Sequence, residues 1–171
     1  MSYLWMLLSP ILTMRLMAEE KQRRTDQLLL TSPVSLPGIV WGKYLAAVTV
    51  MLLTALLTGV FVLVVAIYGA VYPGELMVGY LGFVLQGCAF AALDLYVSSL
   101  TGSPVTAAIL AFGANFTLWM LDLLETAVTL PWLASVMRFF SLYSRNEPFL
   151  MGQLSLANIV YDLSFALACL V

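Results

Sequence analysis

Long apolar blocks alternate with short polar segments along the whole chain. The apolar blocks cover residues 3–17, 41–69, 77–100, 104–121 and 156–171. A helix needs roughly 20 apolar residues to cross the hydrocarbon core of a bilayer, and the three central blocks are long enough. The pattern therefore predicts an all-α fold, a polytopic membrane helical bundle that forms one transmembrane domain over residues 1–171.

Two features of the blocks refine this prediction. Leu100-Thr101-Gly102-Ser103-Pro104 joins the third and fourth blocks, and this helix-breaking turn predicts an antiparallel helical hairpin. The first and last blocks have only about 15 residues each, or ~22 Å of helix. We interpret both as helices cut by the ends of the chain, so that about five spans of a predicted six are covered.

Composition excludes a water-soluble domain. Hydrophobic residues make up 63% of the chain and charged residues 9%, with a mean hydropathy of +1.01, whereas a soluble domain has roughly 25% charged residues. The chain has no His, which excludes imidazole metal ligands and a His base. Cys88 and Cys169 lie inside apolar blocks and are interpreted as packing residues, and no metal site is predicted.

Charge placement predicts the orientation of the bundle. Five of the seven Lys and Arg residues lie in or beside the connection between the first two blocks: Arg15, Lys21, Arg23, Arg24 and Lys43. The positive-inside rule places this connection, residues 18–40, in the cytoplasm. Alternation of the spans then places residues 122–155 outside, where apolar stretches with scattered charges and aromatic residues predict short re-entrant or interfacial helices.

The cytoplasmic connection begins with a charged stretch of strong helix formers. Residues 15–30 contain no Gly or Pro, so the first span is expected to continue as a helix through residue 30. Glu19/Arg23 and Glu20/Arg24 are i,i+4 pairs, each worth about 0.2 to 0.5 kcal/mol. On these residues alone, the connection is either a charged loop that anchors two spans at the headgroups or a docking element for a soluble partner.

The docking interpretation depends on an apolar knuckle beside the charged stretch. Its residues are Leu28, Leu29, Leu30, Pro33 and Val34, and Pro33 also ends the predicted helix. An exposed apolar face next to charged side chains is the combination that helix-in-groove recognition needs. We therefore treat the whole connection as a candidate docking surface.

Short motifs in this connection, and further along the chain, occur together in one known family. They are Glu19-Glu20-Lys21, the run from Leu28 to Ser35 (L-L-L-T-S-P-V-S), Gly42-Lys43, Tyr80-Leu81-Gly82 and Ser98-Ser99-Leu100-Thr101. Together they resemble the signature of type-2 ABC exporter permeases, closest to the subfamily associated with gliding motility. Two departures stand out: Arg24 replaces a Gly of the family pattern, and Asp26-Gln27 replaces an apolar residue and Glu.

The resemblance implies that the connection is a coupling helix, which receives force from a separate ATP-binding subunit. The implied ATPase-docking residues are Glu19, Glu20, Arg23, Arg24, Leu28, Leu29, Leu30, Pro33 and Val34. The chain has no G-x-x-x-x-G-K-[ST] phosphate loop. No cofactor is therefore expected in this chain, and ATP and Mg²⁺ are expected on the partner ATPase.

The resemblance also implies partners, a location and a function. A second permease chain, identical or related, would pair with this one in the plasma membrane of a bacterium or archaeon, among membrane lipids and without nucleic acid. The implied function is the permease subunit of an ATP-driven exporter, and not an enzyme. The alternative is a membrane scaffold or anchor of an ATP-driven motility or assembly machine that moves no solute.

Polar residues inside the apolar blocks are the remaining candidates. Asp94 and Asn115 are candidate path-lining residues, because polar and ionisable groups in hydrocarbon are costly and are often functional. Asp94 either lines the path or reaches the cytoplasmic headgroups. For Asn115 we favour an interhelical hydrogen bond, worth roughly 0.6 kcal/mol in membranes. Asp162 lies deeper in the last block beside Tyr161, and Arg138 and Arg145 are candidate cationic partners for it.

Overall fold

The computed structural model describes residues 3–25, 35–68, 73–127 and 141–170. Its helices are α1 (Tyr3–Gln22), α3 (Leu36–Tyr68), α4 (Pro73–Leu100), α5 (Pro104–Ala127), α7 (Leu142–Leu150) and α8 (Leu156–Leu170). No strand is found among these described residues. The predicted all-α helical membrane bundle is confirmed.

Three of the described helices are long and apolar enough to cross a membrane. The qualifying stretches are Pro37–Tyr68 in α3, Gly74–Leu100 in α4 and Pro104–Leu124 in α5. α8 is apolar but has only 15 residues, and the last turns of α1 carry charged side chains. The chain is therefore a multi-pass membrane protein, whereas the first and last predicted spans stay predictions.

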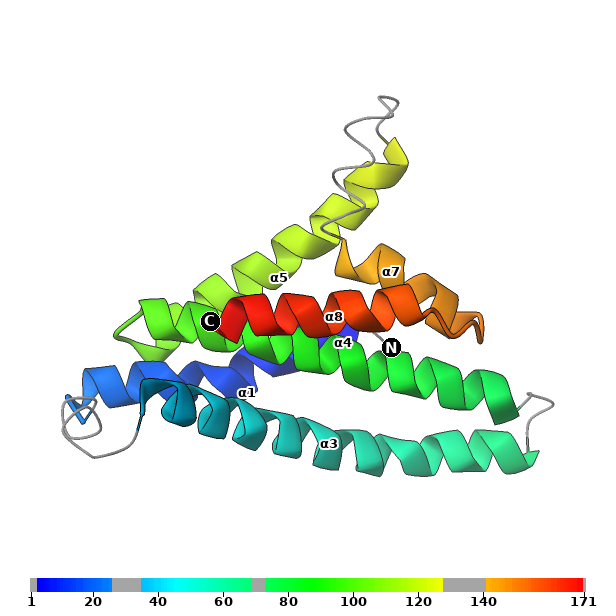
Figure 1. Cartoon of the computed structure of the whole chain (residues 1–171), viewed down its shortest axis with the longest axis horizontal. Helices are drawn as coiled ribbons and strands as arrows, with labels where there is room; N and C mark the ends of the chain where they lie inside the picture. The colour runs from blue at the N-terminus through cyan, green and yellow to red at the C-terminus, as the bar shows by residue number, and fades with distance from the viewer. Residues whose placement is uncertain (1–2, 26–34, 69–72, 128–140, 171) are drawn as a thin grey trace.

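α4 lies at the centre of the bundle (Figure 1). It contacts each of the other described helices, α1, α3, α5, α7 and α8. Small side chains allow this, because Ala89, Ala91 and Ala92 of α4 and Ala107 of α5 are fully buried and let the backbones approach closely. α5 returns from the predicted turn after α4 and diverges from α4 toward its own C-terminal end (Figure 1).

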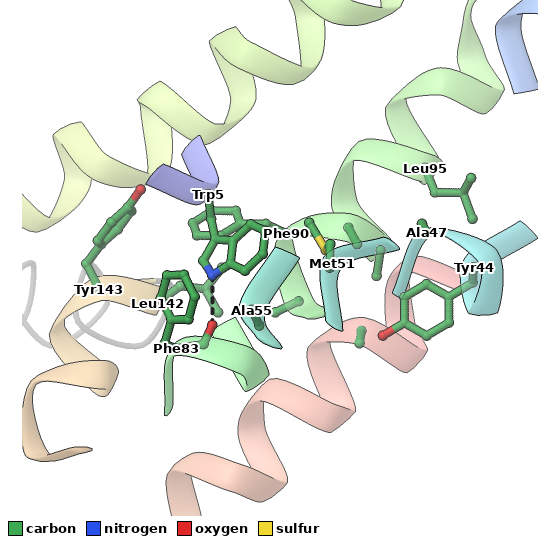
Figure 2. Packing of buried hydrophobic residues seen from close by; sticks show 14 residues of the cluster. Trp5, Tyr44, Ala47, Met51, Ala55, Phe83, Phe90, Leu95, Leu142 and Tyr143 are labelled. Atoms are coloured by element: carbon green, nitrogen blue, oxygen red, sulfur yellow. Dashed lines mark hydrogen bonds between the residues drawn. The ribbon is translucent and has the colours of Figure 1, made fainter. Parts of the chain in front are cut away.

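Trp5 joins α1 to the middle of α4. Its indole N–H donates a hydrogen bond to the Phe83 carbonyl over 2.8 Å, and its ring stacks on the Phe83 ring with centroids 4.8 Å apart (Figure 2). Gly87 lies directly against the indole, and a Cβ at this position would be 2.8 Å from the nearest ring atom. The absence of a side chain at Gly87 therefore permits the close approach of α1 and α4.

α3 presents a wide apolar surface on the side that faces away from the bundle. Leu53, Leu57, Phe61 and Ile67 are each more than half exposed. A patch of this size is unusual on a soluble monomer, whereas lipid tails solvate it. The stripe of α3 side chains that is buried in the core consists of Tyr44, Ala47, Met51 and Ala55.

The segment predicted to hold short helices, residues 122–155, contains the end of α5 and the whole of α7. Ser141 caps α7: its hydroxyl oxygen accepts a hydrogen bond from the Ser144 amide over 3.1 Å and donates one to the Asp122 carboxylate over 2.9 Å. Phe149 of α7 is fully buried against Gly82 of α4. One short helix is thus present here, and residues 128–140 lie outside the described part.

Candidate functional site

Four helices meet at one end of the bundle, on the left of Figure 1. α1 and α4 end there, and α3 and α5 begin there. This region, which we call the basic end, carries Arg15, Lys21, Arg23, Arg24 and Lys43. It is the place where the predicted coupling segment leaves α1 and enters α3.

Lys43 ties the beginning of α3 to the end of α1. Its ammonium group donates a hydrogen bond to the Leu16 carbonyl over 2.6 Å and forms an ion pair with the Glu20 carboxylate. The Lys43 side chain is only 14% exposed, so its ammonium group is largely screened from solvent, whereas the Glu20 side chain is 33% exposed. The structure pairs Glu20 with Lys43 of another helix, where the i,i+4 rule predicted Arg24.

Two further contacts tie the end of α1 to the end of α4. The Ser98 hydroxyl accepts a hydrogen bond from the Ala18 amide over 3.2 Å and donates one to the Met14 carbonyl over 3.3 Å. In an α-helix the amide of residue 18 pairs with the carbonyl of residue 14, so Ser98 bonds to both groups of one such pair. In addition, the Lys21 ammonium donates to the Ser99 carbonyl, which lies in the last turn of α4, where carbonyls lack intrahelical partners.

The predicted Glu19–Arg23 ion pair is present, and unlike the Glu20–Lys43 pair it lies within one helix. Arg23 and Glu19 are 2.7 Å apart, and the Arg23 side chain is 72% exposed. This i,i+4 pair confirms the local prediction. Because both residues lie on α1 and the Arg23 side chain faces solvent, the pair joins no helices and contributes little to stability.

Arg24 ends α1 earlier than the sequence predicted. Its φ angle is +56°, in the left-handed region, its amide donates to the Lys21 carbonyl over 3.2 Å, and the Thr25 amide donates to the Glu20 carbonyl over 3.0 Å. These two bonds form a Schellman motif with Arg24 at the position that usually holds Gly. The helix expected to continue through residue 30 therefore ends at Gln22. The Gly in the family pattern that Arg24 replaces suits this turn.

Replacing Arg24 with Gly is expected to stabilise the end of α1 by about 1 kcal/mol, because Gly adopts the left-handed region without steric strain. Arg24→Ala removes the same charge but keeps a Cβ, so it is the matched control. Hydrogen exchange of the Thr25 amide reports opening of the turn. The amide should exchange more slowly in Arg24→Gly than in Arg24→Ala, and equal exchange in the two variants would contradict the left-handed assignment.

The predicted docking residues divide into two groups. The structure places Glu19, Glu20, Arg23 and Arg24 at the basic end, whereas the apolar knuckle, Leu28, Leu29, Leu30, Pro33 and Val34, lies outside the described residues. Sequence reasoning used Lys43 for the orientation of the bundle and predicted no contact between helices for Lys43 or Ser98. The available signal was their place in the motifs Gly42-Lys43 and Ser98-Ser99-Leu100-Thr101. Among the described residues, no cluster of metal-ligating side chains is found.

Asp94 and Asn115 meet inside the bundle together with Ser9, and we call the three the buried triad. The Asn115 amide group donates hydrogen bonds to the Asp94 carboxylate over 3.0 Å and to the Ser9 hydroxyl oxygen over 3.3 Å. All three residues are fully buried, and they come from α4, α5 and α1. The interhelical hydrogen bond favoured for Asn115 is therefore present. Asp94 is enclosed by neighbouring helices within the described chain, and its role in a path stays a prediction.

Asp162 has the electrostatic partner that the sequence offered. The guanidinium group of Arg145 on α7 lies over the Tyr161 ring of α8, 3.8 Å from the centroid, and its positive charge is near the adjacent Asp162 carboxylate. The Asn158 amide group donates to the Arg145 carbonyl over 2.8 Å. These contacts join α7 to α8. The other candidate partner, Arg138, lies outside the described residues.

The fold and the basic end define a class: a multi-pass helical membrane protein whose helices are tied together where a charged connection leaves the bundle. The family model described as "ABC-2 family transporter protein" matches residues 1–152. The chain belongs to this family, and it is a permease subunit of an ABC transporter rather than an enzyme. The family normally works with an ABC ATPase. No curated protein and no solved structure gives a significant match to the chain.

Proposed function

We propose that the chain is the permease of an ATP-driven exporter and that its basic end lies in the cytoplasm, where a separate ATPase binds. The observation that carries this proposal is the meeting of four helix ends at the connection between α1 and α3. Five of the seven basic residues of the chain lie at this end. The positive-inside rule favours the same orientation in a bacterial or archaeal plasma membrane.

In this proposal ATP binding closes the partner ATPase, and the coupling segment around residues 28–35 moves with it. ATP and Mg²⁺ are bound by the partner. A second permease chain, identical or related, completes the path, and the exposed apolar surface of α3 leaves room for that chain or for lipids. The motif resemblance favours the gliding-motility-associated subfamily. Two functions then remain, an exporter and a mechanical anchor, and they predict different responses of ATP hydrolysis to substrates.

The response of ATP hydrolysis to substrates separates these functions. The complex is reconstituted in nanodiscs with its ATPase, and hydrolysis is measured with added lipids, glycans and peptides. An exporter should hydrolyse ATP faster with at least one of these classes of compound. Hydrolysis that responds to none of them would overturn the exporter proposal in favour of a mechanical anchor.

A further inference from the structure

The two ends of the coupling segment are fastened to each other and to α4. We infer that Glu20, Lys21, Lys43 and Ser98, together called the clamp, position the helix ends so that movement of the coupling segment reaches α4. The inference rests on the proposed function, because it needs an ATPase that moves the segment. The contacts that carry it are independent of any partner.

The contacts of Lys43 hold the beginning of α3 against the end of α1. The Lys43 ammonium is held between the Glu20 carboxylate and the Leu16 carbonyl, and its side chain is 14% exposed. The Lys43 ammonium is more deeply buried than the Arg23 guanidinium and has an additional hydrogen bond, so it fixes geometry better than Arg23 does in its pair with Glu19. The coupling segment therefore leaves and re-enters the bundle at a fixed point.

A second set of contacts holds the end of α1 against the end of α4. The Ser98 hydroxyl of α4 accepts a hydrogen bond from the Ala18 amide and donates one to the Met14 carbonyl, both in the backbone of α1. Lys21, less than one turn further along α1, donates to the Ser99 carbonyl of α4. Sliding or rotation of α1 against α4 would break these bonds together. A displacement of α1 is therefore passed to α4 instead of being absorbed by the connection.

The position of α4 in the bundle explains why this matters. α4 contacts α1, α3, α5, α7 and α8, so its displacement reaches every other described helix. Coupling between distant sites needs a contiguous set of packed and hydrogen-bonded groups. Without the clamp, the ATPase should still bind the coupling segment, but its movement should no longer reach the spans. Lys21, Lys43 and Ser98 thus act as positioning residues, and Glu20, which the motif resemblance also places among the docking residues, acts in the clamp through its pair with Lys43.

The functional test uses Lys43→Met, which removes the ammonium group and keeps an unbranched side chain. The ATPase should copurify with this variant in the wild-type amount. The difference in hydrolysis rate between the complex and the free ATPase should shrink by at least about fivefold, the lower range of coupling between sites. Lys43→Arg, which keeps the positive charge, should retain the wild-type difference. Arg15→Met, which removes an exposed basic side chain of the same end that belongs neither to the clamp nor to the docking residues, is the matched control.

A distance measurement tests the clamp without any ATPase. Spin labels are placed at Gln22→Cys on α1 and Gly42→Cys on α3, where a Cβ meets nothing within 4 Å, after both native cysteines are replaced by Ala. The label distance should be narrowly distributed with Lys43 and with Lys43→Arg, and broad with Lys43→Met.

Two results overturn the inference. One is an unchanged hydrolysis difference in Lys43→Met, and the other is an equally narrow label distance in that variant. If the wild-type chain binds no ABC ATPase, the proposed function fails and the transmission role fails with it. The label distance would then still report whether the two helix ends are clamped, so the two failures are distinguishable.

Discussion

Asn115→Leu is expected to destabilise the bundle by about 2 to 3 kcal/mol, the cost of leaving a buried polar group without its partner. The hydrogen bond alone would account for roughly 0.6 kcal/mol in a membrane protein. The larger value should apply because Asp94 is fully buried and Asn115 donates to it over 3.0 Å. In the variant the Asp94 carboxylate stays buried but loses the hydrogen bond from Asn115, and Ser9 is the remaining polar residue of the triad.

The effect is measured on the purified chain in mixed micelles. The fraction of a denaturing detergent is raised stepwise, and unfolding is followed by circular dichroism. Thr117→Leu on the exposed side of α5 is the matched control, because its hydroxyl bonds only to the Gly113 carbonyl of the same helix. The double variant Asp94→Leu with Asn115→Leu should recover much of the lost stability. If Asn115→Leu unfolds at the wild-type midpoint, the buried triad does not hold α1, α4 and α5 together.

The double variant Leu29→Glu with Pro33→Glu is expected to weaken binding of the ATPase by at least about 30-fold, the effect of losing an interface hot spot of about 2 kcal/mol. Apolar side chains that fill a partner's groove are replaced by carboxylates that would be desolvated there without a counter-charge. Copurification of a co-expressed ATPase with the tagged chain measures the loss.

Gln22→Glu is the control for this experiment, since it adds a carboxylate to the exposed end of α1 outside the clamp. It should leave the amount of copurified ATPase unchanged. Should Leu29→Glu with Pro33→Glu retain both the ATPase and its activity, the apolar knuckle is not the docking surface. The result would then favour a charged loop that anchors two spans.

The three long helices could be predicted closely because their signals are local. The block predicted at 77–100 became α4 (Pro73–Leu100), and the Gly and Pro of the following turn fixed where α5 begins. α1 was harder, because nothing in its helix propensities marks Arg24 as a left-handed residue. Its early end is visible only in the backbone bonds that close the Schellman motif.

The candidate site shows a different limit of sequence reasoning. The i,i+4 rule found Glu19–Arg23, which is local, and assigned Glu20 to Arg24, although Glu20 pairs with Lys43 on another helix. Asn115 was expected to bond across helices, but only the packing of α4 against α5 identified Asp94 as its partner. Sequence patterns identify such groups, whereas the approach of distant helices determines their partners.

The central claim is that this permease couples to an ABC ATPase through its basic end. The most direct measurement is copurification of the tagged chain with an ABC ATPase from the same genome, followed by vanadate-sensitive ATP hydrolysis by the complex and by the free ATPase. The account predicts a stable complex whose hydrolysis rate differs from that of the free ATPase. An ATPase that neither binds the chain nor changes its rate in the chain's presence would contradict it.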